Sequence, residues 1–204
     1  MPRNPERDQQ LREQRKKLLL DSALQVIAKR GIGLTSIQDI AKAAGLSVGN
    51  VYTYFSSKDE LFSELLRRAQ TEYGISVTLL AELDEDPLLK LRRMCAEWLA
   101  LETNWAFTII LQTVRTNEMV PADIRQAVTD RFTANLEPVA DIMRQGQRSG
   151  QILNGDPLQL ALYFVSLIQG LTLQQAPGYV IPVPVNPDDI VRLFEAKNTH
   201  AKNI

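Results

Sequence analysis

Apolar residues recur with helical spacing along almost the whole chain. Between Leu20 and Ile27 they fall at i, i+3, i+4 and i+7, and the pattern stops at Gly31, a residue type common at helix C-termini. A second, shorter apolar face runs from Ile37 to Ala44. Strand-like alternation occurs only in the stretch YVIPVPV, where the prolines favour an extended loop. The pattern therefore predicts an all-α protein.

Polar residues that cap helices mark the starts of the next elements. Thr35 with Gln38 has the spacing of a capping box, and so has Ser57 with Glu60. Ser47 is placed to cap a short helix between these two. The helix that follows Ser57 keeps its apolar positions and is predicted to continue to about residue 83. A cluster of three short helices thus precedes one long helix.

The second half of the chain begins new helices at two Asp-Pro pairs, at 86–87 and 156–157. Asp serves as an N-cap, and proline suits the first helical position because its missing N–H would be unpaired there anyway. Between these pairs the pattern predicts a helix over 105–114 and a long amphipathic helix over 120–148. Pro138 should kink the long helix, since it lacks the N–H and clashes with the preceding turn.

The spacing of the three short helices is typical of a helix-turn-helix, in which a three-residue turn containing glycine joins the second and third helices. The turn is Gly45-Leu46-Ser47, with Val51 behind it in the seam between the helices. The third helix would meet base edges with its first turns, and an asparagine such as Asn50 can pair bidentately with adenine. The same spacing also fits a turn-rich helical hairpin with exposed tyrosines.

Charge is distributed unevenly between the two parts of the chain. Residues 1–58 carry ten Lys/Arg against five Asp/Glu, a net charge of +5, whereas the net charge of the whole chain is −1. A basic N-terminal part on an acidic body indicates a polyanionic partner for the first part only. Ahead of the first apolar face lies a basic arm, which would either track DNA phosphates or be a solvated tail: Arg3, Arg7, Arg12, Arg15, Lys16 and Lys17.

Composition excludes several other classes of function. A single cysteine, Cys95, excludes an intrachain disulfide and is typical of a reducing cytoplasm, where we expect the protein to reside. One Cys and one His, His200, far apart in sequence argue against a metal site, and we expect no cofactor. No apolar run has the length of a membrane span or signal peptide, so no membrane partner is expected. A helical enzyme is disfavoured because the chain has no paired carboxylates, nucleophile–base pair or phosphate loop.

The stretch TSIQDIAKAAGLSVGNVYTYFSSKDELFSELL, residues 35–66, closely resembles the DNA-binding signature of the tetracycline-repressor (TetR) family of bacterial transcription regulators. The resemblance covers about 50 residues and implies a helix-turn-helix DNA-binding domain, 1–62, followed by a helical ligand-sensing and dimerisation domain, 63–204. It implies phosphate contacts from Thr35, Ser36, Ser47, Tyr54 and Lys58. It implies base or near-base contacts from Val48, Gly49, Asn50 and Tyr52.

In the family that the chain resembles, helices of the second domain enclose a small-molecule pocket. Apolar and aromatic residues with two polar anchors are the candidates for the pocket lining here: Trp98, Trp105, Phe107, Gln112, Arg115, Met119, Phe132 and Met143. Each of them also fits an ordinary helical core, and Arg115 also fits a surface ion pair. The effector is expected to be a small molecule, whose identity the chain does not specify.

The helix beginning at Pro157 is apolar nearly all round, so one apolar stripe needs a partner other than its own chain. With a last helix over 187–197 it would form a four-helix interface between two copies, through Leu158, Leu162, Val165, Ile168, Leu171, Ile190 and Phe194. The sequence thus predicts a homodimeric repressor that binds a pseudo-palindromic double-stranded DNA operator and is released by an inducer. The alternative is a DNA-binding activator or architectural factor that responds to no inducer.

Overall fold

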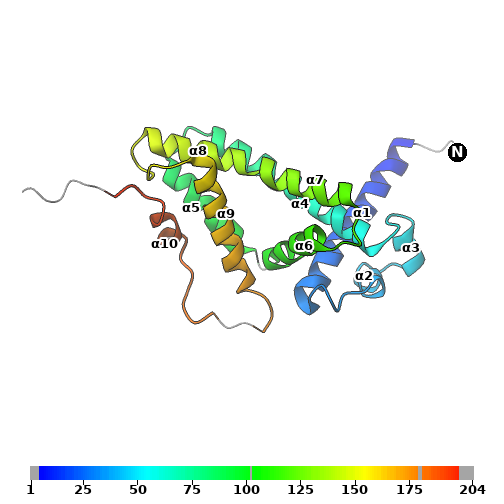
Figure 1. The fold of residues 1–204 in the computed structure, drawn as a ribbon. Coiled ribbons are helices and arrows are strands. Elements are labelled where there is room, and N and C mark those ends of the chain that lie inside the picture. Colours follow the sequence, from blue (N-terminus) through cyan, green and yellow to red (C-terminus); the bar gives the residue numbers. More distant parts are fainter. Residues whose placement is uncertain (1–4, 102, 179–180, 198–204) are drawn as a thin grey trace, which may run out of the picture.

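The computed structural model describes residues 5–101, 103–178 and 181–197, and within them the chain forms ten α-helices and no strand longer than an isolated bridge (Figure 1). The helices are α1 (Pro5–Arg30), α2 (Ile37–Ala43), α3 (Val48–Tyr52), α4 (Lys58–Glu82), α5 (Pro87–Ala100), α6 (Asn104–Thr116), α7 (Ala122–Ala134), α8 (Leu136–Arg148), α9 (Pro157–Leu173) and α10 (Pro187–Arg192). The all-α fold predicted from the spacing is confirmed. We call α1–α3 with the first turns of α4 the head, and the remaining helices the body.

The capping residues of the head lie close to their predicted positions, with one correction. The N-cap of α2 is Ser36, whose hydroxyl accepts from the Asp39 backbone N–H while the Asp39 carboxylate accepts from the Ser36 N–H. The capping box predicted at Thr35 and Gln38 is therefore wrong by one residue. Ser47 caps α3 as predicted, by accepting from the Asn50 N–H.

The start of α4 confirms Ser57 as the N-cap, which accepts from the Glu60 N–H at 3.0 Å. The second hydrogen bond of the expected capping box, from the Ser57 backbone N–H to the Glu60 carboxylate, differs. The Glu60 carboxylate accepts from the backbone N–H and the hydroxyl of Ser56, one residue earlier. The helix runs to Glu82, close to the predicted end at residue 83. It is the one element of the head that continues into the body (Figure 1).

The basic arm is part of a helix. α1 begins at Pro5, so five of the six arm residues lie on it; Arg3 lies outside the described residues. Residues 5–17 have no apolar face to reveal the helix, but they are rich in Gln, Glu, Arg and Lys, which are strong helix formers. A bond from Gln9 to Glu13, one turn on, adds to this local stability. The helix therefore extends the basic residues away from the apolar part of α1.

The long helix predicted over 120–148 is instead two helices, α7 and α8, which break at Asn135 rather than bend at Pro138. The break lies in the turn before the proline, where the proline ring excludes the normal helical position of the carbonyl four residues earlier. Asn135 then donates from its side chain to the Gln70 carbonyl of α4, at 2.7 Å. A Cβ on Gly74 would lie 2.4 Å from the Asn135 Oδ1, so the glycine permits this close approach.

The last helix is shorter than predicted, because α10 ends at Arg192 and the chain after it pairs with the loop between α8 and α9. The Leu153 N–H donates to the Phe194 carbonyl at 2.9 Å, and the Ala196 N–H donates to the Gln151 carbonyl at 2.8 Å. This pairing uses backbone groups that a continued helix would need. The C-terminal segment is therefore fixed to the body by an antiparallel contact.

The described residues form two apolar cores, and α4 takes part in both of them. One core joins α1–α4 with α6 and α7, and the other joins α4 and α5 with α8–α10. Helices α6 and α7 thus belong to the head's core by packing. Trp105, Ile110 and Val114 are the α6 residues that fill it, each at most 5% exposed.

Candidate DNA interface and ligand cavity

The α2–α3 turn holds its short helix at the surface of the head. Gly45 adopts φ +66°, in the left-handed region that glycine tolerates, and the Leu46 N–H donates to the Ala41 carbonyl at 2.9 Å. Val51 and Phe55 are buried in the seam, at 0% and 2% exposed. The seam therefore fixes one side of α3 and leaves the other in solvent.

The residues expected to face DNA are mostly on that free side. Ser47, Gly49, Asn50 and Tyr52 are exposed, and Val48 and Tyr54 are half-buried. Thr35 differs, because it is only 2% exposed and its hydroxyl donates to the Gly31 carbonyl at 2.8 Å. Its hydroxyl closes the loop before α2, and its backbone N–H donates to the Ile32 carbonyl at 3.3 Å, so neither donor of Thr35 is left free for a phosphate.

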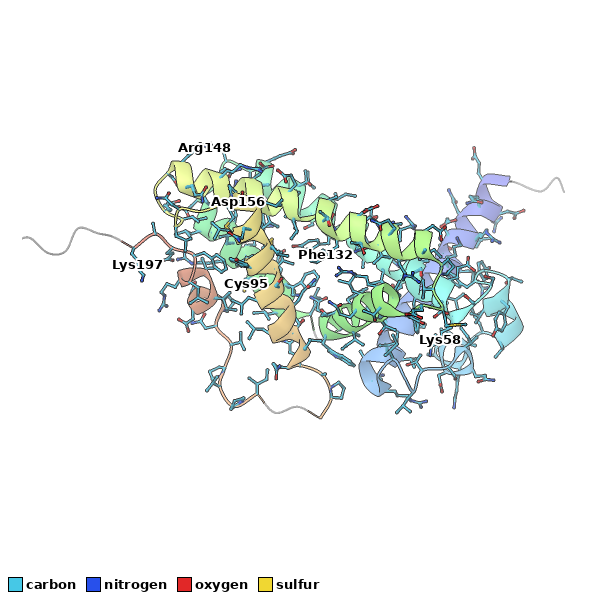
Figure 2. The ribbon with its side chains drawn as sticks, viewed as in Figure 1. Lys58, Cys95, Phe132, Arg148, Asp156 and Lys197 are labelled. Carbon is cyan, nitrogen blue, oxygen red and sulfur yellow. The ribbon has the colours of Figure 1, made fainter. Side chains whose placement is uncertain are left out.

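Lys58 has partners within the head. Its ammonium donates to the Ile32 carbonyl at 3.3 Å and lies 5.3 Å from the centre of the Phe62 ring (Figure 2). These contacts hold Lys58 beside the loop between α1 and α2, at the N-terminus of α4. A phosphate at this position would meet both the ammonium and the unpaired N–H groups of the first turn of α4.

Arg12, a residue of the basic arm, makes a contact with the head that the motif does not reveal. Its guanidinium lies 5.2 Å from the centre of the Tyr54 ring, which joins the basic half of α1 to the end of α3. The interaction is a cation–π contact between segments 42 residues apart in sequence, and only the bend of the chain through α2 brings them together. Arg12 thus adjoins Tyr54 in the turn that follows α3.

Two carboxylates of the head are held ionised by hydrogen bonds. The pKa of Asp39 is lowered chiefly by the hydrogen bonds from Ser36, with a further contribution from Arg30, whose Nη1 lies 2.7 Å from it. The pKa of Glu60 is lowered chiefly by the hydrogen bonds from Ser56. Both anions lie at helix N-termini, where the helix dipole favours negative charge.

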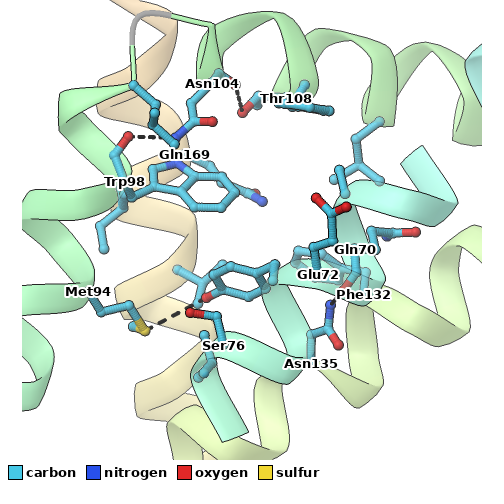
Figure 3. Close-up of a pocket in the computed structure, with 18 of the residues that line it drawn as sticks. Gln70, Glu72, Ser76, Met94, Trp98, Asn104, Thr108, Phe132, Asn135 and Gln169 are labelled. Carbon is cyan, nitrogen blue, oxygen red and sulfur yellow. Dashed lines mark hydrogen bonds between the residues drawn. The ribbon is translucent and has the colours of Figure 1, made fainter. Parts of the chain in front are cut away.

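The body contains a cavity of about 320 Å³ between α4, α5, α6, α7, α8 and α9 (Figure 3). Its wall is largely apolar and aromatic, as is usual for a site that takes a small organic molecule. The residues that line it are Leu66, Ala69, Gln70, Glu72, Tyr73, Ser76, Val77, Leu80, Met94, Glu97, Trp98, Leu101, Asn104, Phe107, Thr108, Leu111, Phe132, Asn135, Leu136, Val165, Ile168 and Gln169.

Three of the eight residues expected to line a pocket do so: Trp98, Phe107 and Phe132. The other five lie elsewhere. Trp105 and Met143 are buried in the two cores, and Met119 is 83% exposed in the loop after α6. Gln112 is exposed, and the Arg115 guanidinium lies over the Phe132 ring at 5.5 Å, outside the lining.

Several expected lining residues lie elsewhere because α6 has two apolar faces. Positions 104, 107, 108 and 111 face the cavity at i, i+3, i+4 and i+7, while Trp105, Ile110 and Val114 face the head. Periodicity identifies both faces but does not say which one meets the cavity. No residue of α4 was among the expected lining residues, although residues from Leu66 to Leu80 line the cavity.

Polar groups occupy defined places in the cavity wall. The Asn104 amide donates to the Trp98 carbonyl at 2.6 Å, and the hydroxyls of Thr108 and Thr172 lie 3.4 Å apart. Tyr73 and Trp98 pack edge to face with ring centres 5.1 Å apart. Burial raises the pKa of the Tyr73 phenol, so it remains neutral at physiological pH. The Trp98 indole N–H is buried without a hydrogen-bond partner in the described part of the chain.

Gln70 joins the cavity wall to α7. Its amide donates to the Val128 carbonyl at 3.0 Å and its Oε1 accepts from Arg131 at 3.1 Å. Its backbone carbonyl accepts the bond from Asn135 described above. Gln70 and Asn135 both line the cavity, so an occupant would touch the groups that connect α4 to the α7–α8 break.

The residues expected to form a dimer interface divide into two sets on α9 and α10. Val165, Ile168, Ile190 and Phe194 are at most 7% exposed within a single chain, and Leu171 is half-buried. Leu158 and Leu162 on α9 are each 39% exposed, and Tyr163 beside them is 53% exposed. Of the residues expected in the interface, Leu158 and Leu162, with Tyr163 beside them, are therefore the ones most exposed to a partner.

The described part of the chain has neither a metal-binding cluster nor a helix that could cross a membrane. It contains no group of three or more His, Cys, Asp or Glu side chains arranged to hold a metal ion, and His200 lies outside it. Among the same residues, no helix combines the length and apolar character that a bilayer crossing requires.

The head is a helix-turn-helix, and it shares its core with a helical body that encloses a cavity. This combination is typical of DNA-binding transcription regulators with an effector-sized pocket. Residues 19–65 match the family described as bacterial regulatory proteins, tetR family. This match supports a TetR-family transcriptional regulator, with the DNA-binding domain of that family in the head.

Known proteins resemble both the head and the full chain. The regulator AcrR of Shigella flexneri is 36% identical over 77 residues, a match that covers 37% of this chain and about a third, 36%, of AcrR. The probable acrEF/envCD operon repressor of Escherichia coli (strain K12) is 23% identical over 86% of this chain and 84% of that protein. A putative regulator from Saccharomonospora viridis, solved with choline, superposes with TM-score 0.70 and 24% identity over 89% and 93% of the two chains.

Proposed function

We propose that the protein is a ligand-released transcriptional repressor, which acts in the cytoplasm and binds a pseudo-palindromic operator as a homodimer. The observation that carries the proposal is the double role of α6. One face of this helix fills the core of the head through Trp105, Ile110 and Val114, while the other lines the cavity through Phe107, Thr108 and Leu111. A ligand that displaces α6 must therefore strain the packing of the head.

Helix α4 supports the same coupling. It begins at Lys58 beside the expected DNA face, and eight residues later it reaches the cavity at Leu66. The bonds of Gln70 and Asn135 fix this part of α4 against α7 and α8. An occupant that alters those bonds would change the direction in which α4 holds the head.

Dimerisation follows from the exposed stripe on α9. Three large apolar side chains, Leu158, Leu162 and Tyr163, stand together beside the small residues Ser166 and Gly170, which would let a second helix approach closely. Two copies joined by this stripe would carry two heads. Two-fold symmetry of the protein then matches two half-sites about one helical turn or slightly more apart on the DNA, about 34–36 Å centre to centre at the minimum.

The descriptions of two similar proteins support a repressor that responds to a small molecule. One is described as a probable operon repressor, and the structural neighbour from Saccharomonospora viridis holds choline. We therefore propose repression by the DNA-bound form and release by a small-molecule inducer, rather than an activating or architectural role.

The test uses an operator selected by the full-length protein from a random duplex pool. Compounds that shift its tryptophan fluorescence are then titrated with and without operator. We expect the ligand to weaken operator binding, and operator to weaken ligand binding by the same factor, because linkage is reciprocal. A ligand that saturates the cavity and leaves operator affinity unchanged would overturn release by induction.

A further inference from the structure

The ionised side chains around the cavity are all of one sign. Among the described residues that line it, Glu72 and Glu97 are carboxylates, and none is a lysine, arginine or histidine. Their side chains are 65% and 58% exposed, which places both at the mouth of the cavity rather than in its interior. In Figure 3 the Glu72 carboxylate points into the space between the Trp98 ring and Gln70.

Both carboxylates are held only by exposed ion pairs within their own helices. Arg68 Nε lies 2.9 Å from Glu72, and Arg93 Nε lies 3.0 Å from Glu97, each one turn away. Such pairs change an equilibrium by about a factor of two. Arg68 also pairs with Asp21 at 3.1 Å, so it keeps a partner if Glu72 turns toward a ligand.

The aromatic wall behind the mouth favours the same charge. The edge-to-face packing of Tyr73 and Trp98 leaves ring faces whose electron density attracts a cation. Phe132 already carries the Arg115 guanidinium on its ring, so Tyr73, Trp98 and Phe107 are the rings left for a ligand. Because the Tyr73 phenol is neutral, it adds no charge to those of the two glutamates.

An anion would be disfavoured at this site. A carboxylate or phosphate inside the cavity would lose its water, meet apolar walls and face two carboxylates without a cationic side chain in the lining. A neutral apolar molecule would gain from burial alone. A positively charged group at the mouth gains from burial of its apolar part and from the two glutamates together.

We infer that the effector is a lipophilic monocation, a largely apolar molecule with one quaternary or protonated amine. Its charged group lies at the mouth between Glu72 and Glu97, and its apolar part fills the cavity toward Leu136 and Ile168. This inference rests on the proposal that the cavity is the effector site.

Three probes with a ten-carbon chain isolate the charge: decyltrimethylammonium, decan-1-ol and decanoate. Each is titrated below its micelle concentration into the full-length protein, with tryptophan fluorescence and calorimetry as readouts. We expect decyltrimethylammonium to bind about tenfold more tightly than the alcohol, and decanoate to bind most weakly. Ala69→Phe, which places a ring in the cavity, should abolish binding of every probe that occupies it.

The double variant Glu72→Gln with Glu97→Gln should erase the preference for the cation and leave the affinity for decan-1-ol unchanged. The matched control is Glu118→Gln with Glu137→Gln, which changes net charge equally at exposed positions outside the lining. The control should keep the preference for the cation. A preference lost equally in both double variants would mean that net charge alone attracts the probe.

The inference is overturned if decanoate binds most tightly, if alcohol and cation bind equally, or if no probe binds. Its failure is distinct from failure of the proposed function. A neutral probe that binds and weakens operator affinity leaves the cavity as the effector site and removes the charge requirement. A cation whose binding depends on the two glutamates, but which leaves operator affinity unchanged, confirms the charge requirement and contradicts induction.

Discussion

Gly49 lies in the first turn of α3, on the side that we propose faces DNA. A Cβ added there would meet nothing within 4 Å, and no left-handed backbone is required. Gly49→Ala should therefore leave the fold intact and stabilise α3 by up to about 1 kcal/mol, since alanine is the better helix former. The same methyl group would stand between α3 and a closely approached groove, so operator affinity should fall. Thermal unfolding and operator titration measure the two effects, and an alanine variant with unchanged affinity would contradict the close approach.

Asp39 stabilises the start of α2 in its ionised form. Its pKa is lowered in the folded state, so its contribution is present above the ordinary aspartate pKa of about 4 and is lost as pH falls through the folded value. Wild type should therefore be more stable than Asp39→Asn at pH 7, and the difference should shrink on acidification toward pH 3. Urea unfolding of both proteins over this range measures it. A difference that stays constant with pH would contradict the role of the charge.

At the scale of elements, the junction between α4 and the α7–α8 break depends on Gly74 and Asn135. Gly74→Ala alone pushes the Asn135 amide away, since the new Cβ would lie 2.4 Å from its Oδ1, and loses the bond to the Gln70 carbonyl. With Asn135→Ala already present, Gly74→Ala should instead stabilise α4 by about 1 kcal/mol. A double-mutant cycle measured by urea unfolding should thus show coupling between the two sites, and additive effects would contradict the contact.

An exposed and a buried position of α9 should respond differently to the same charge. Leu162→Glu places a carboxylate on the exposed stripe and should give a folded monomer, whereas Val165→Glu buries one in the core and should destabilise the chain itself. Leu79→Glu, at a leucine 59% exposed on α4, is the matched control and should stay dimeric. Light scattering with thermal unfolding separates these outcomes. A dimer that survives Leu162→Glu would place the interface elsewhere.

On the scale of the whole molecule, local sequence signals predicted the helices and turns, whereas tertiary contacts determine which face of each helix packs against the head or lines the cavity. The Asp-Pro pairs, the Gly45 turn and the place of Val51 in the seam were predicted correctly because each depends on residues close in sequence. The cavity was predicted less well, because both faces of α6 are apolar and only packing assigns Trp105 to the head. The basic half of α1 carried no apolar periodicity, so neither its helix nor the contact of Arg12 with Tyr54 could be read from spacing.

The central claim is that α3 reads base sequence while residues around it hold the phosphates. The measurement is the affinity of wild type, Asn50→Ala and Lys58→Ala for the selected operator and for a scrambled duplex over a salt series, after circular dichroism confirms that each variant folds. Asn50→Ala should lose about 1–3 kcal/mol of preference for the operator. Lys58→Ala should weaken both duplexes equally and reduce the salt slope by about one unit per half-site. Equal binding of the two duplexes by wild type would contradict base reading by α3. A base preference that Lys58→Ala alters and Asn50→Ala keeps would contradict the roles of the two residues.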